Sequence, residues 1–449
     1  MAIPQKLLES LEHVKGFDRE AFEKVHVSGE QVTSIRLNPL KSMVHGPWTM
    51  DKIPWCPHGC YLSARPSFTL DPLFHAGAYY VQEASSMFLW HALQEVIGSN
   101  THKKVLDLCA APGGKSTLLA SYFKDGLIIA NEVIKSRAAV LVENITKWGS
   151  GHVIVTNNDP SHFQSLPGYF DVIVIDAPCS GSGLFRKDPT AIEEWSEDNV
   201  QLCSQRQQRI LADVLPALKE NGILIYSTCS YSAEEDETIA DWLVTEMAME
   251  SKQLNINAEW NIVETASPGK KAYGYRFYPD KIKGEGFFMA VFQKKESANE
   301  TRLKEQSLTI PSKQEWQQIN SFIEIPGDLT LFKQSGSVRA IKKEWLHDLQ
   351  VLAKCLYIKK AGIDIGAVKG KDVIPGHELA LSNLSKAFIP VPLTEDQALQ
   401  YLRRKELVLE GAPKGWNLVS YGGLPLGWVK VLPNRVNNYY PTEWRILKE

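Results

Sequence analysis

Residues 105–116 read VLDLCAAPGGKS, an apolar strand-like run that leads through a turn of small residues into a helical stretch. Small residues in such a turn let a ligand approach the backbone closely. The turn also follows the carboxyl end of the strand, which is where parallel sheets bind their ligands. This order of elements predicts an α/β sheet with a binding site at the turn.

Apolar strand-like runs alternate with helical stretches from Val105 to about Lys295. The runs are VLDLC, LIIANE, HVIVTN, DVIVID, GILIYST and FFMAVF. Such alternation is typical of a parallel sheet covered by helices on both faces, so the sequence predicts the doubly wound α/β class. Ahead of this region, helical periodicity followed by QVTSIRLNPL predicts a mixed α+β element.

Acidic residues follow three of these runs. Glu132 comes about 18 residues after Gly114, a spacing that suits a pair of ribose hydroxyls. Asp159 follows HVIVTNN, and Asp176 follows DVIVI. A single acid at a strand end is often only a turn former, but three along one sheet edge favour a site for a nucleoside cofactor.

Other interpretations of the glycine turn remain open at this point. A phosphate-binding loop would need glycine where the chain has Cys109, and a dinucleotide fingerprint would need a third glycine beside Gly113 and Gly114. A turn that merely joins strand to helix is the remaining alternative.

Two cysteines follow later strands of the predicted sheet. Cys179 lies in DAPCSGSG directly after DVIVI, and Cys229 lies in STCSY directly after GILIY. Two thiols at the edge that carries the cofactor site indicate nucleophilic chemistry. Ser232 and Glu235 have the spacing of a capping box, so we expect a helix to begin just beyond Cys229.

The composition bounds the class of protein. The chain has 449 residues, 44% of them hydrophobic and 22% charged, which predicts a globular protein of two to four domains. Its net charge of -3 excludes a uniformly basic nucleic-acid-binding protein but allows a local basic patch. Because the sequence shows neither a signal peptide nor an apolar run of membrane-spanning length, we expect a cytoplasmic protein without a membrane partner.

The cysteines do not form a recognisable disulfide or metal pattern. There are seven, an odd number that is widely spread, which favours reduced thiols. Cys56 and Cys60 could form half of a zinc site, but no second pair is visible, so we expect no bound metal. Cys203 and Cys355 lie in apolar contexts that are typical of core positions.

Several segments, taken in order, resemble the Sun-type RNA (cytosine-C5) methyltransferases. They are SIRLNPLK, YYVQEASSM, LDLCAAPGGKS, IIANE, NNDP, VIVIDAPCSGSG, LIYSTCSYSAEEDE and EGFFMAVFQKK. The resemblance implies a Rossmann-like core that binds S-adenosylmethionine and methylates cytidine in RNA. It also implies a cofactor pocket lined by Cys109, Ala110, Ala111, Pro112, Gly113, Gly114, Lys115, Glu132, Asp159 and Asp176, with Cys229 as the catalytic nucleophile.

The chemistry of this reaction explains why two cysteines would be needed. C5 of cytosine is a weak nucleophile, so a thiolate adds at C6 and converts the ring to an enamine whose C5 can attack a methyl donor. The adduct must then lose its C5 proton and expel the thiol; we assign assistance in this release to Cys179 and a hold on the base to Asp176. From the residues alone Cys179 and Cys229 could exchange roles, since DNA cytosine methyltransferases use the cysteine of a Pro-Cys pair. The family resemblance favours Cys229.

The C-terminal third is similar to the bacterial small-subunit ribosomal RNA methyltransferase F branch of this family. GLPLGWVKVLPNRVNNYYPTEWRI resembles a PUA-like RNA-binding module, and KKAGIDIGAVKGKDVIPGHELALS before it fits the same branch. We therefore expect an N-terminal RNA-binding element (1–98), a catalytic domain (99–296), a linker (297–312), an intermediate module (313–388) and a PUA-like module (389–449). The implied partner is 16S ribosomal RNA or the small ribosomal subunit.

Two stretches interleave basic and aromatic residues, as suits phosphate contact and base stacking. One runs from Lys270 to Lys295 and the other from Trp428 to Arg445, and a solvated strand edge is the alternative for the first. Two rival functions remain. A transfer RNA cytosine-C5 methyltransferase would use the same chemistry, whereas a non-catalytic RNA-binding ribosome-assembly factor would not need both Cys179 and Cys229.

Overall fold

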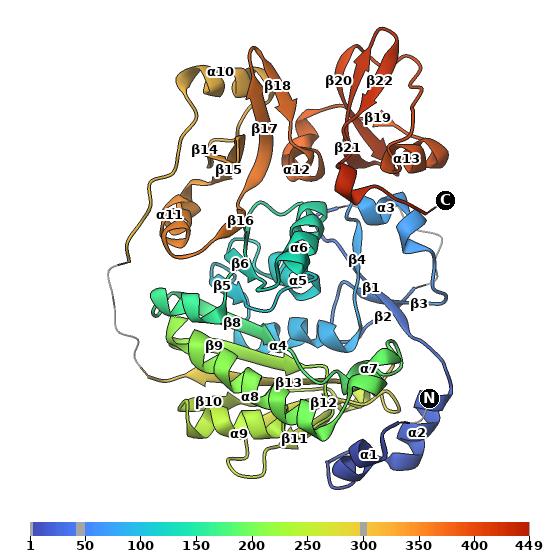
Figure 1. Cartoon of the computed structure of the whole chain (residues 1–449), viewed down its shortest axis with the longest axis vertical. Helices are drawn as coiled ribbons and strands as arrows, with labels where there is room; N and C mark the ends of the chain where they lie inside the picture. The colour runs from blue at the N-terminus through green and yellow to red at the C-terminus, as the bar shows by residue number, and fades with distance from the viewer. Residues whose placement is uncertain (1–2, 42–49, 297–302, 449) are drawn as a thin grey trace.

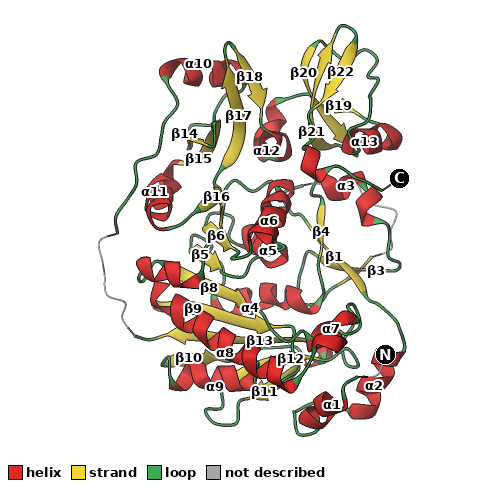
Figure 2. Cartoon of the chain, in the orientation of Figure 1, coloured by secondary structure: helices red, strands yellow, loops and turns green. Residues whose placement is uncertain are grey.

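The computed structural model describes residues 3–41, 50–296 and 303–448 (Figure 1). Within this part the chain forms a ten-stranded sheet and three four-stranded sheets, of which two lie together at one end of the molecule and one lies beside the large sheet (Figure 1). Helices cover the strands from outside (Figure 2). No helix in the described ranges has the length and apolar character that crossing a bilayer requires.

The N-terminal element contains a small antiparallel sheet of order β2-β3-β1-β4. Its helices and strands are α1 (Gln5–Leu11), α2 (Arg19–Val27), β1 (Thr33–Leu37), β2 (Met50–Lys52), β3 (Gly59–Leu62), η1 (Phe68–Leu70), α3 (Pro72–His75), β4 (Tyr79–Val81), η2 (Ser85–Phe88) and α4 (Leu89–Val96). Helices α1 and α2 lie apart from this sheet, beside the catalytic core (Figure 1).

The core alternates strands and helices, as the sequence predicted. It contains β5 (Lys104–Asp107), α5 (Gly114–Tyr122), β6 (Leu127–Asn131), α6 (Lys135–Trp148), β7 (Val153–Thr156), η3 (Pro160–Ser165), β8 (Phe170–Asp176), η4 (Ser182–Leu184), α7 (Thr190–Glu194), α8 (Glu197–Val214), η5 (Leu215–Ala217), β9 (Leu218–Thr228), α9 (Glu237–Thr245), β10 (Met249–Lys252), η6 (Ala258–Trp260), β11 (Val263–Ala266), β12 (Tyr273–Phe277) and β13 (Phe287–Lys294). The neighbours β7, β6, β5, β8 and β9 pair in parallel, and β13 is antiparallel to β9. The six predicted runs are thus all strands of one Rossmann-like sheet, which confirms the predicted fold class.

Side chains of the parallel strands alternate between two buried layers. Val105 and Ile128 pack into one layer with α5 and α6, whereas Leu106 and Ile129 pack into the other with α8 and α9. Successive residues of a strand point to opposite faces, so a strand covered by helices on both sides must be apolar throughout. This is why each of these runs is apolar at every position instead of alternating between apolar and polar residues.

The C-terminal third forms two further sheets, of order β14-β15-β17-β18 and β19-β20-β21-β22. Its elements are α10 (Lys313–Phe322), β14 (Leu329–Gln334), β15 (Ser337–Lys342), η7 (Lys343–Trp345), α11 (Leu346–Cys355), β16 (Ile358–Lys360), β17 (Ile363–Lys369), β18 (Asp372–Pro375), α12 (His377–Leu381), η8 (Asn383–Ala387), β19 (Val391–Pro392), α13 (Glu395–Leu402), β20 (Gly415–Tyr421), β21 (Leu424–Leu432), β22 (Arg435–Asn438) and η9 (Thr442–Trp444). A capping box of Thr394 and Gln397 starts α13.

Strand β16 belongs to the central sheet rather than to the C-terminal sheets. It pairs antiparallel with β7, and Ile358 lies opposite Thr156. The expected linker 297–312 lies partly outside the described residues, and its described part is mostly exposed but is held by hydrogen bonds. There Gln306 N–H donates to Gln350 O at 3.0 Å, and Lys333 N–H donates to Thr309 O at 2.7 Å. The linker is thus hydrogen-bonded to α11 and β14 of the C-terminal third, and β16 joins that third to the central sheet.

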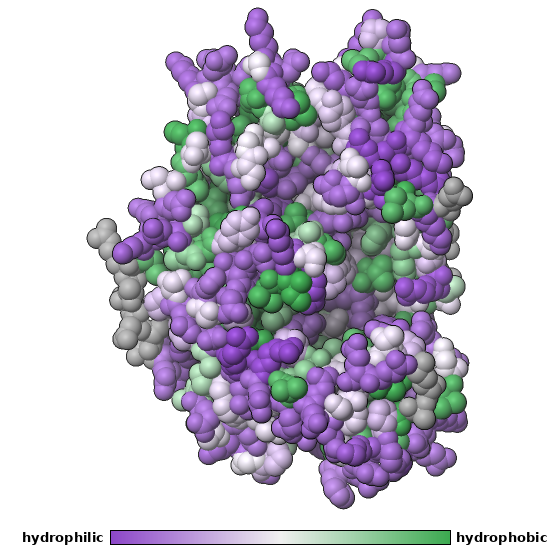
Figure 3. All heavy atoms as spheres, in the orientation of Figure 1, coloured by the Kyte–Doolittle hydropathy of each residue, from purple (hydrophilic) through white to green (hydrophobic). Residues whose placement is uncertain are grey.

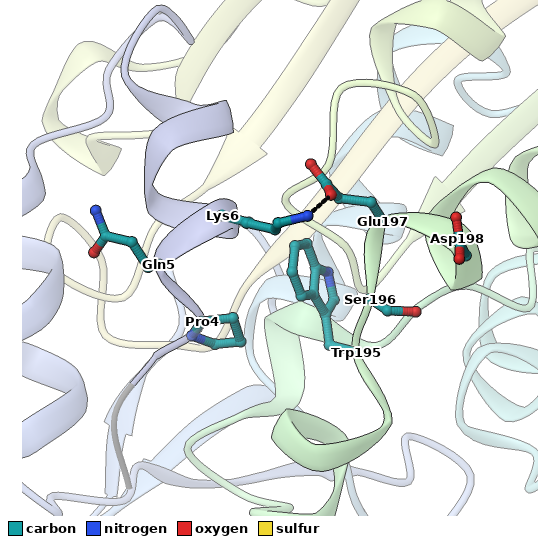
Figure 4. A pocket seen from close by; sticks show the side chains of 7 residues that line it. All are labelled: Pro4, Gln5, Lys6, Trp195, Ser196, Glu197 and Asp198. Carbon is teal, nitrogen blue, oxygen red and sulfur yellow. Dashed lines mark hydrogen bonds and ion pairs between the residues drawn. The ribbon is translucent and has the colours of Figure 1, made fainter.

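Helices α1 and α2 contact the segments that follow the two cysteines. Phe22 of α2 is fully buried, and its ring lies 5.0 Å from that of Tyr231 in an edge-to-face arrangement. A shallow pocket lies between α1 and the start of α8; in Figure 4 Lys6 points across it toward Glu197, above Trp195. None of the predicted site residues lines this pocket.

Candidate active site

The turn after β5 has the geometry that its small residues predicted. Gly113 precedes α5 with φ at +119°, a conformation that side chains with a Cβ rarely adopt. A Cβ on Gly114 would lie 3.3 Å from the ring of Tyr80. Below the turn, Ser116 Oγ–H donates to Asp107 Oδ2 at 2.6 Å, and burial raises the pKa of Asp107 to about 7.

The N-terminal sheet supports the same turn through Arg36 of β1, a fully buried residue. Its guanidinium donates to Gln82 Oε1 at 2.8 Å, to Thr117 Oγ1 at 2.5 Å and to Gly114 O at 3.2 Å. Burial lowers the pKa of Arg36 to about 10, so it stays charged at neutral pH. The N-terminal element thereby fixes the start of α5.

Two neighbouring cavities gather the predicted site residues. The larger, of about 480 Å³, is lined by Cys109, Ala111, Glu132, Asp159, Asp176, Cys179 and Cys229. The smaller, of about 190 Å³, shares Cys109, Ala111 and Asp176 and is also lined by Ala110, Pro112, Gly114 and Lys115. Gly113 lines neither and acts through its backbone conformation. The larger volume is in the range of small-molecule sites. Figure 3 shows the hollow in this face, between the parts that carry α6 and α7.

Glu132 fits a ribose. It is almost fully buried, and its Oε1 accepts a hydrogen bond from Ile134 N–H at 2.9 Å. Its Oε2 has no hydrogen bond from any described residue, although Arg137 forms an ion pair with it at 3.5 Å. A buried carboxylate oxygen with free acceptor capacity suits the hydroxyl groups of a nucleoside cofactor.

Two other acids of the cavity have defined partners. Asp176 Oδ2 lies 2.8 Å from Lys115 Nζ, and its Oδ1 accepts a hydrogen bond from Ser227 Oγ at 2.9 Å. Asp159 Oδ1 accepts from Ser161 Oγ at 2.7 Å, a bond that lowers the pKa of Asp159. Among described residues no cluster of histidine, cysteine and acidic side chains could hold a metal ion. Cys56 and Cys60 are buried in two different apolar clusters.

The two cysteines lie side by side. The Sγ atoms of Cys179 and Cys229 are 3.1 Å apart, and both line the larger cavity. Cys229 O accepts a hydrogen bond from Gly183 N–H at 2.9 Å, which ties the two loops together. The hydrogen bond with Cys229, together with burial, raises the pKa of Cys179 well above its ordinary value. In the absence of a bound base the contact therefore favours the protonated form of Cys179.

The expected capping box after Cys229 is wrong. Helix α9 begins at Glu237, and Glu235 turns back beneath the cysteine loops, fully buried. Its carboxylate accepts hydrogen bonds from Ser180 N–H at 2.8 Å, Ser230 Oγ at 2.6 Å and Gln207 Nε2 at 3.2 Å. Each serine directly follows one of the two cysteines. Ser180 and Gln207 are remote from Glu235 in sequence, which is why the local spacing pointed to a cap.

The expected RNA contacts between Lys270 and Lys295 are wrong for the residues at their centre. Tyr275, Phe277 and Tyr278 are buried. Arg276 is also buried, in an ion pair with Glu237, and its Nε–H donates to Glu237 Oε1 at 2.8 Å. In the second stretch Trp428 and Tyr440 are core residues, whereas Tyr439, Arg435 and Arg445 are exposed.

Known proteins match this chain along most of its length. The model of the 16S rRNA methyltransferase RsmB/F family matches residues 95–293, the model of the RsmF N-terminal domain matches 3–84, and that of the methyltransferase RsmF PUA domain matches 388–446. Ribosomal RNA small subunit methyltransferase F of Vibrio parahaemolyticus is 31% identical over 91% of this chain and 90% of its own. The Shewanella loihica protein of the same name is 30% identical over 91% and 88%.

The chain belongs to the ribosomal RNA small subunit methyltransferase F family. It is accordingly an S-adenosylmethionine-dependent RNA methyltransferase with a PUA domain at its C-terminus.

Solved structures share the fold of about two thirds of this chain. A methyltransferase homolog from Pyrococcus horikoshii is 28% identical, with a TM-score of 0.52 over 65% of this chain and 99% of that chain. NSun6 from the same organism, solved with the S-adenosylmethionine analogue SFG, shares the fold at 20% identity, with a TM-score of 0.53 over 66% and 99%.

Proposed function

We propose that this chain methylates C5 of cytidine in 16S ribosomal RNA through a covalent adduct between Cys229 and C6 of the base. The observation that carries the proposal is the 3.1 Å separation of the Cys179 and Cys229 sulfurs in the cavity that also contains Glu132, Asp159 and Asp176. Two thiols beside a cofactor-sized cavity match a reaction in which one thiol adds and a second group assists its departure.

The cofactor would be held by the turn Cys109–Lys115 and by the acids at the strand ends. Glu132 would accept hydrogen bonds from the ribose hydroxyls through its free Oε2. Asp159 lines the same wall, on the side of β7. S-adenosylmethionine, when bound, supplies the electrophilic methyl group.

The steps at the base divide between the cysteines. The Cys229 thiolate forms a bond to C6, and electron density moves to C5, which takes the methyl group. Once Cys229 is bonded to C6, its hydrogen bond no longer holds the proton on Cys179, and Cys179 loses that proton to solvent. The Cys179 thiolate then takes the C5 proton, the electron pair of the C5–H bond forms the C5–C6 double bond, and Cys229 leaves as thiolate. Asp176, held by Lys115 and Ser227, faces the cavity and would bind the polar edge of the base. The base must leave its stack to reach this site.

The remaining parts would hold the RNA. We assign RNA binding to the N-terminal element 1–98 and to the PUA-like module 389–449, with 99–296 as catalytic domain, 297–312 as linker and 313–388 as the intermediate module. The family membership and the names of the relatives support ribosomal RNA or the small subunit as partner.

The test measures methyl transfer from labelled S-adenosylmethionine to ribosomal and transfer RNA, with 5-methylcytidine identified by mass spectrometry. Cys229→Ala should be inactive and free of adduct, whereas Cys179→Ala should accumulate a protein–RNA adduct on denaturing gels. The reverse pattern would exchange the two roles. If labelled methyl groups appear only in transfer RNA, ribosomal RNA is not the substrate. If the protein binds RNA without transferring any methyl group, it is a non-catalytic factor.

A further inference from the structure

Two arginines of α8 line the active-site cavity, where the hydrogen bonds from Ser161 lower the pKa of Asp159 and the charge of Arg209 adds to that effect. Arg206 and Arg209 are exposed, and neither makes a hydrogen bond or an ion pair with any residue in the described ranges. Arg137, on the opposite wall, differs: it donates to Ala111 O at 2.8 Å and pairs with Glu132. The free guanidinium groups at the cavity are therefore on the α8 side.

Helix α8 holds these arginines in a fixed position relative to the cysteines. Gln207, between them in sequence, is fully buried and donates to Pro178 O at 3.1 Å and to Glu235 Oε1 at 3.2 Å. Since Pro178 precedes Cys179, a side chain of α8 is bonded directly to the cysteine loop. A guanidinium presents planar pairs of donors that match phosphate oxygens.

An exposed aromatic side chain continues this edge. Tyr357, just before β16, is 62% exposed, and Lys359 Nζ lies 5.4 Å from its ring centre. Tyr357 O accepts hydrogen bonds from Asn157 N–H at 3.1 Å and Asn158 Nδ2 at 3.2 Å. These asparagines precede Asp159, which lines the cavity together with Arg209. The segment 157–159, just before η3, thus connects Tyr357 to the cavity wall that carries the α8 arginines.

We propose that Arg206 and Arg209 bind phosphates of the RNA strand next to the target nucleotide, and that Tyr357 stacks on a base of the same strand. This inference rests on the proposed function and specifies how its substrate is held. The chain's net charge is -3, so attraction to a polyanion must come from local groups, and this edge offers two arginines that form no ion pair with a described residue, together with an exposed aromatic ring beside a lysine. Stacking on an aromatic ring would hold a base of the strand whatever its identity.

Binding of a 16S ribosomal RNA transcript tests the proposal without methyl transfer. The measurement uses the full chain carrying Cys229→Ala, with S-adenosylhomocysteine present, over a series of salt concentrations. Adding R206Q and R209Q should raise the Kd about tenfold or more and reduce the slope of log Kd against log salt by about 0.7 for each phosphate that is no longer neutralised. R206K with R209K should keep most of the slope. Tyr357→Ala should raise the Kd about tenfold with an unchanged slope.

Lys313→Gln is the matched control, because Lys313 is exposed on α10, at the opposite end of the molecule from α8 (Figure 1). It should leave both the Kd and the slope unchanged. Should the α8 variants weaken S-adenosylhomocysteine binding while RNA affinity and slope stay constant, the arginines serve the cofactor and the proposal is overturned. If these residues are needed for RNA binding but the chain with Cys229 intact produces no 5-methylcytidine, the proposed function is overturned and the RNA-binding proposal stands.

Discussion

The Sγ atom of Cys179 lies 3.1 Å from the Sγ atom of Cys229, at the ends of the adjacent parallel strands β8 and β9. Parallel pairing aligns the strand ends, so two segments about fifty residues apart in sequence present their thiols at one point. The contact changes the acidity of Cys179, and this can be measured.

Cys229→Ala should make Cys179 more reactive. The hydrogen bond with Cys229 is the largest cause of the raised pKa of Cys179, so its loss lowers that pKa and increases the thiolate fraction at any given pH below it. Iodoacetamide labelling of Cys179, followed by mass spectrometry from pH 7 to 9, should be faster in the variant. Labelling of Cys355 serves as the internal reference. Equal rates at Cys179 would show that burial alone controls its acidity.

Asp107→Asn should change how stability depends on pH. The pKa of Asp107 is raised from 3.8 to about 7 by burial, so the folded state binds more protons than the unfolded state between these values. Stability is therefore lost as the pH rises through this range. Between pH 5.5 and 8 the parent should lose about 2 kcal/mol more unfolding free energy than the variant. Urea unfolding at the two pH values measures the difference, and parallel behaviour of both proteins would contradict the prediction.

Glu235→Ala should impair catalysis with little effect on cofactor binding. The change leaves Ser180 N–H, Ser230 Oγ and Gln207 without their buried acceptor. Each unpaired group lowers the free energy of unfolding by about 1–3 kcal/mol. Loss of the fixed cysteine positions should lower kcat about tenfold or more. The Kd for S-adenosylhomocysteine should stay within about twofold of the parent, since no cofactor atom is expected near Glu235.

Glu235→Gln is the conservative control for this variant. It retains one acceptor oxygen, so its kcat should lie between those of the parent and Glu235→Ala. A pH profile of adduct formation separates positioning from general destabilisation, because displacement of the cysteine pair changes the ionisation of its thiols, whereas destabilisation lowers adduct formation at every pH. Unchanged kcat in both variants would remove Glu235 from any role at the site.

Phe22→Ala and Lys6→Ala compare two kinds of contact between the N-terminal helices and the core. Phe22 is fully buried against Tyr231, and its truncation should cost about 3–5 kcal/mol. Lys6 and Glu197 form an exposed ion pair across the pocket in Figure 4, so Lys6→Ala should leave the unfolding free energy unchanged. Urea unfolding measures both; equal effects would show that apolar packing is not what holds these helices.

The sequence predicted those features that depend on neighbouring residues. Continuous apolar runs identified the strands, and the residues after each run identified the cavity lining, because every parallel strand ends at the same edge. Features that depend on distant partners were not predictable. Arg276 resembled an exposed RNA contact because its partner Glu237 is 39 residues away, and Glu235 resembled a helix cap because its partner Ser180 is 55 residues away.

The pairing of β16 with β7 has a consequence for how the protein is made. Roughly 200 residues separate the two strands, so β7 leaves the ribosome long before its partner exists. During that interval its outer N–H and C=O groups are open to pairing with another nascent chain. This edge of the catalytic sheet is covered only once residue 360 has been made, so a chain that ends before Ile358 would leave the outer edge of β7 unpaired.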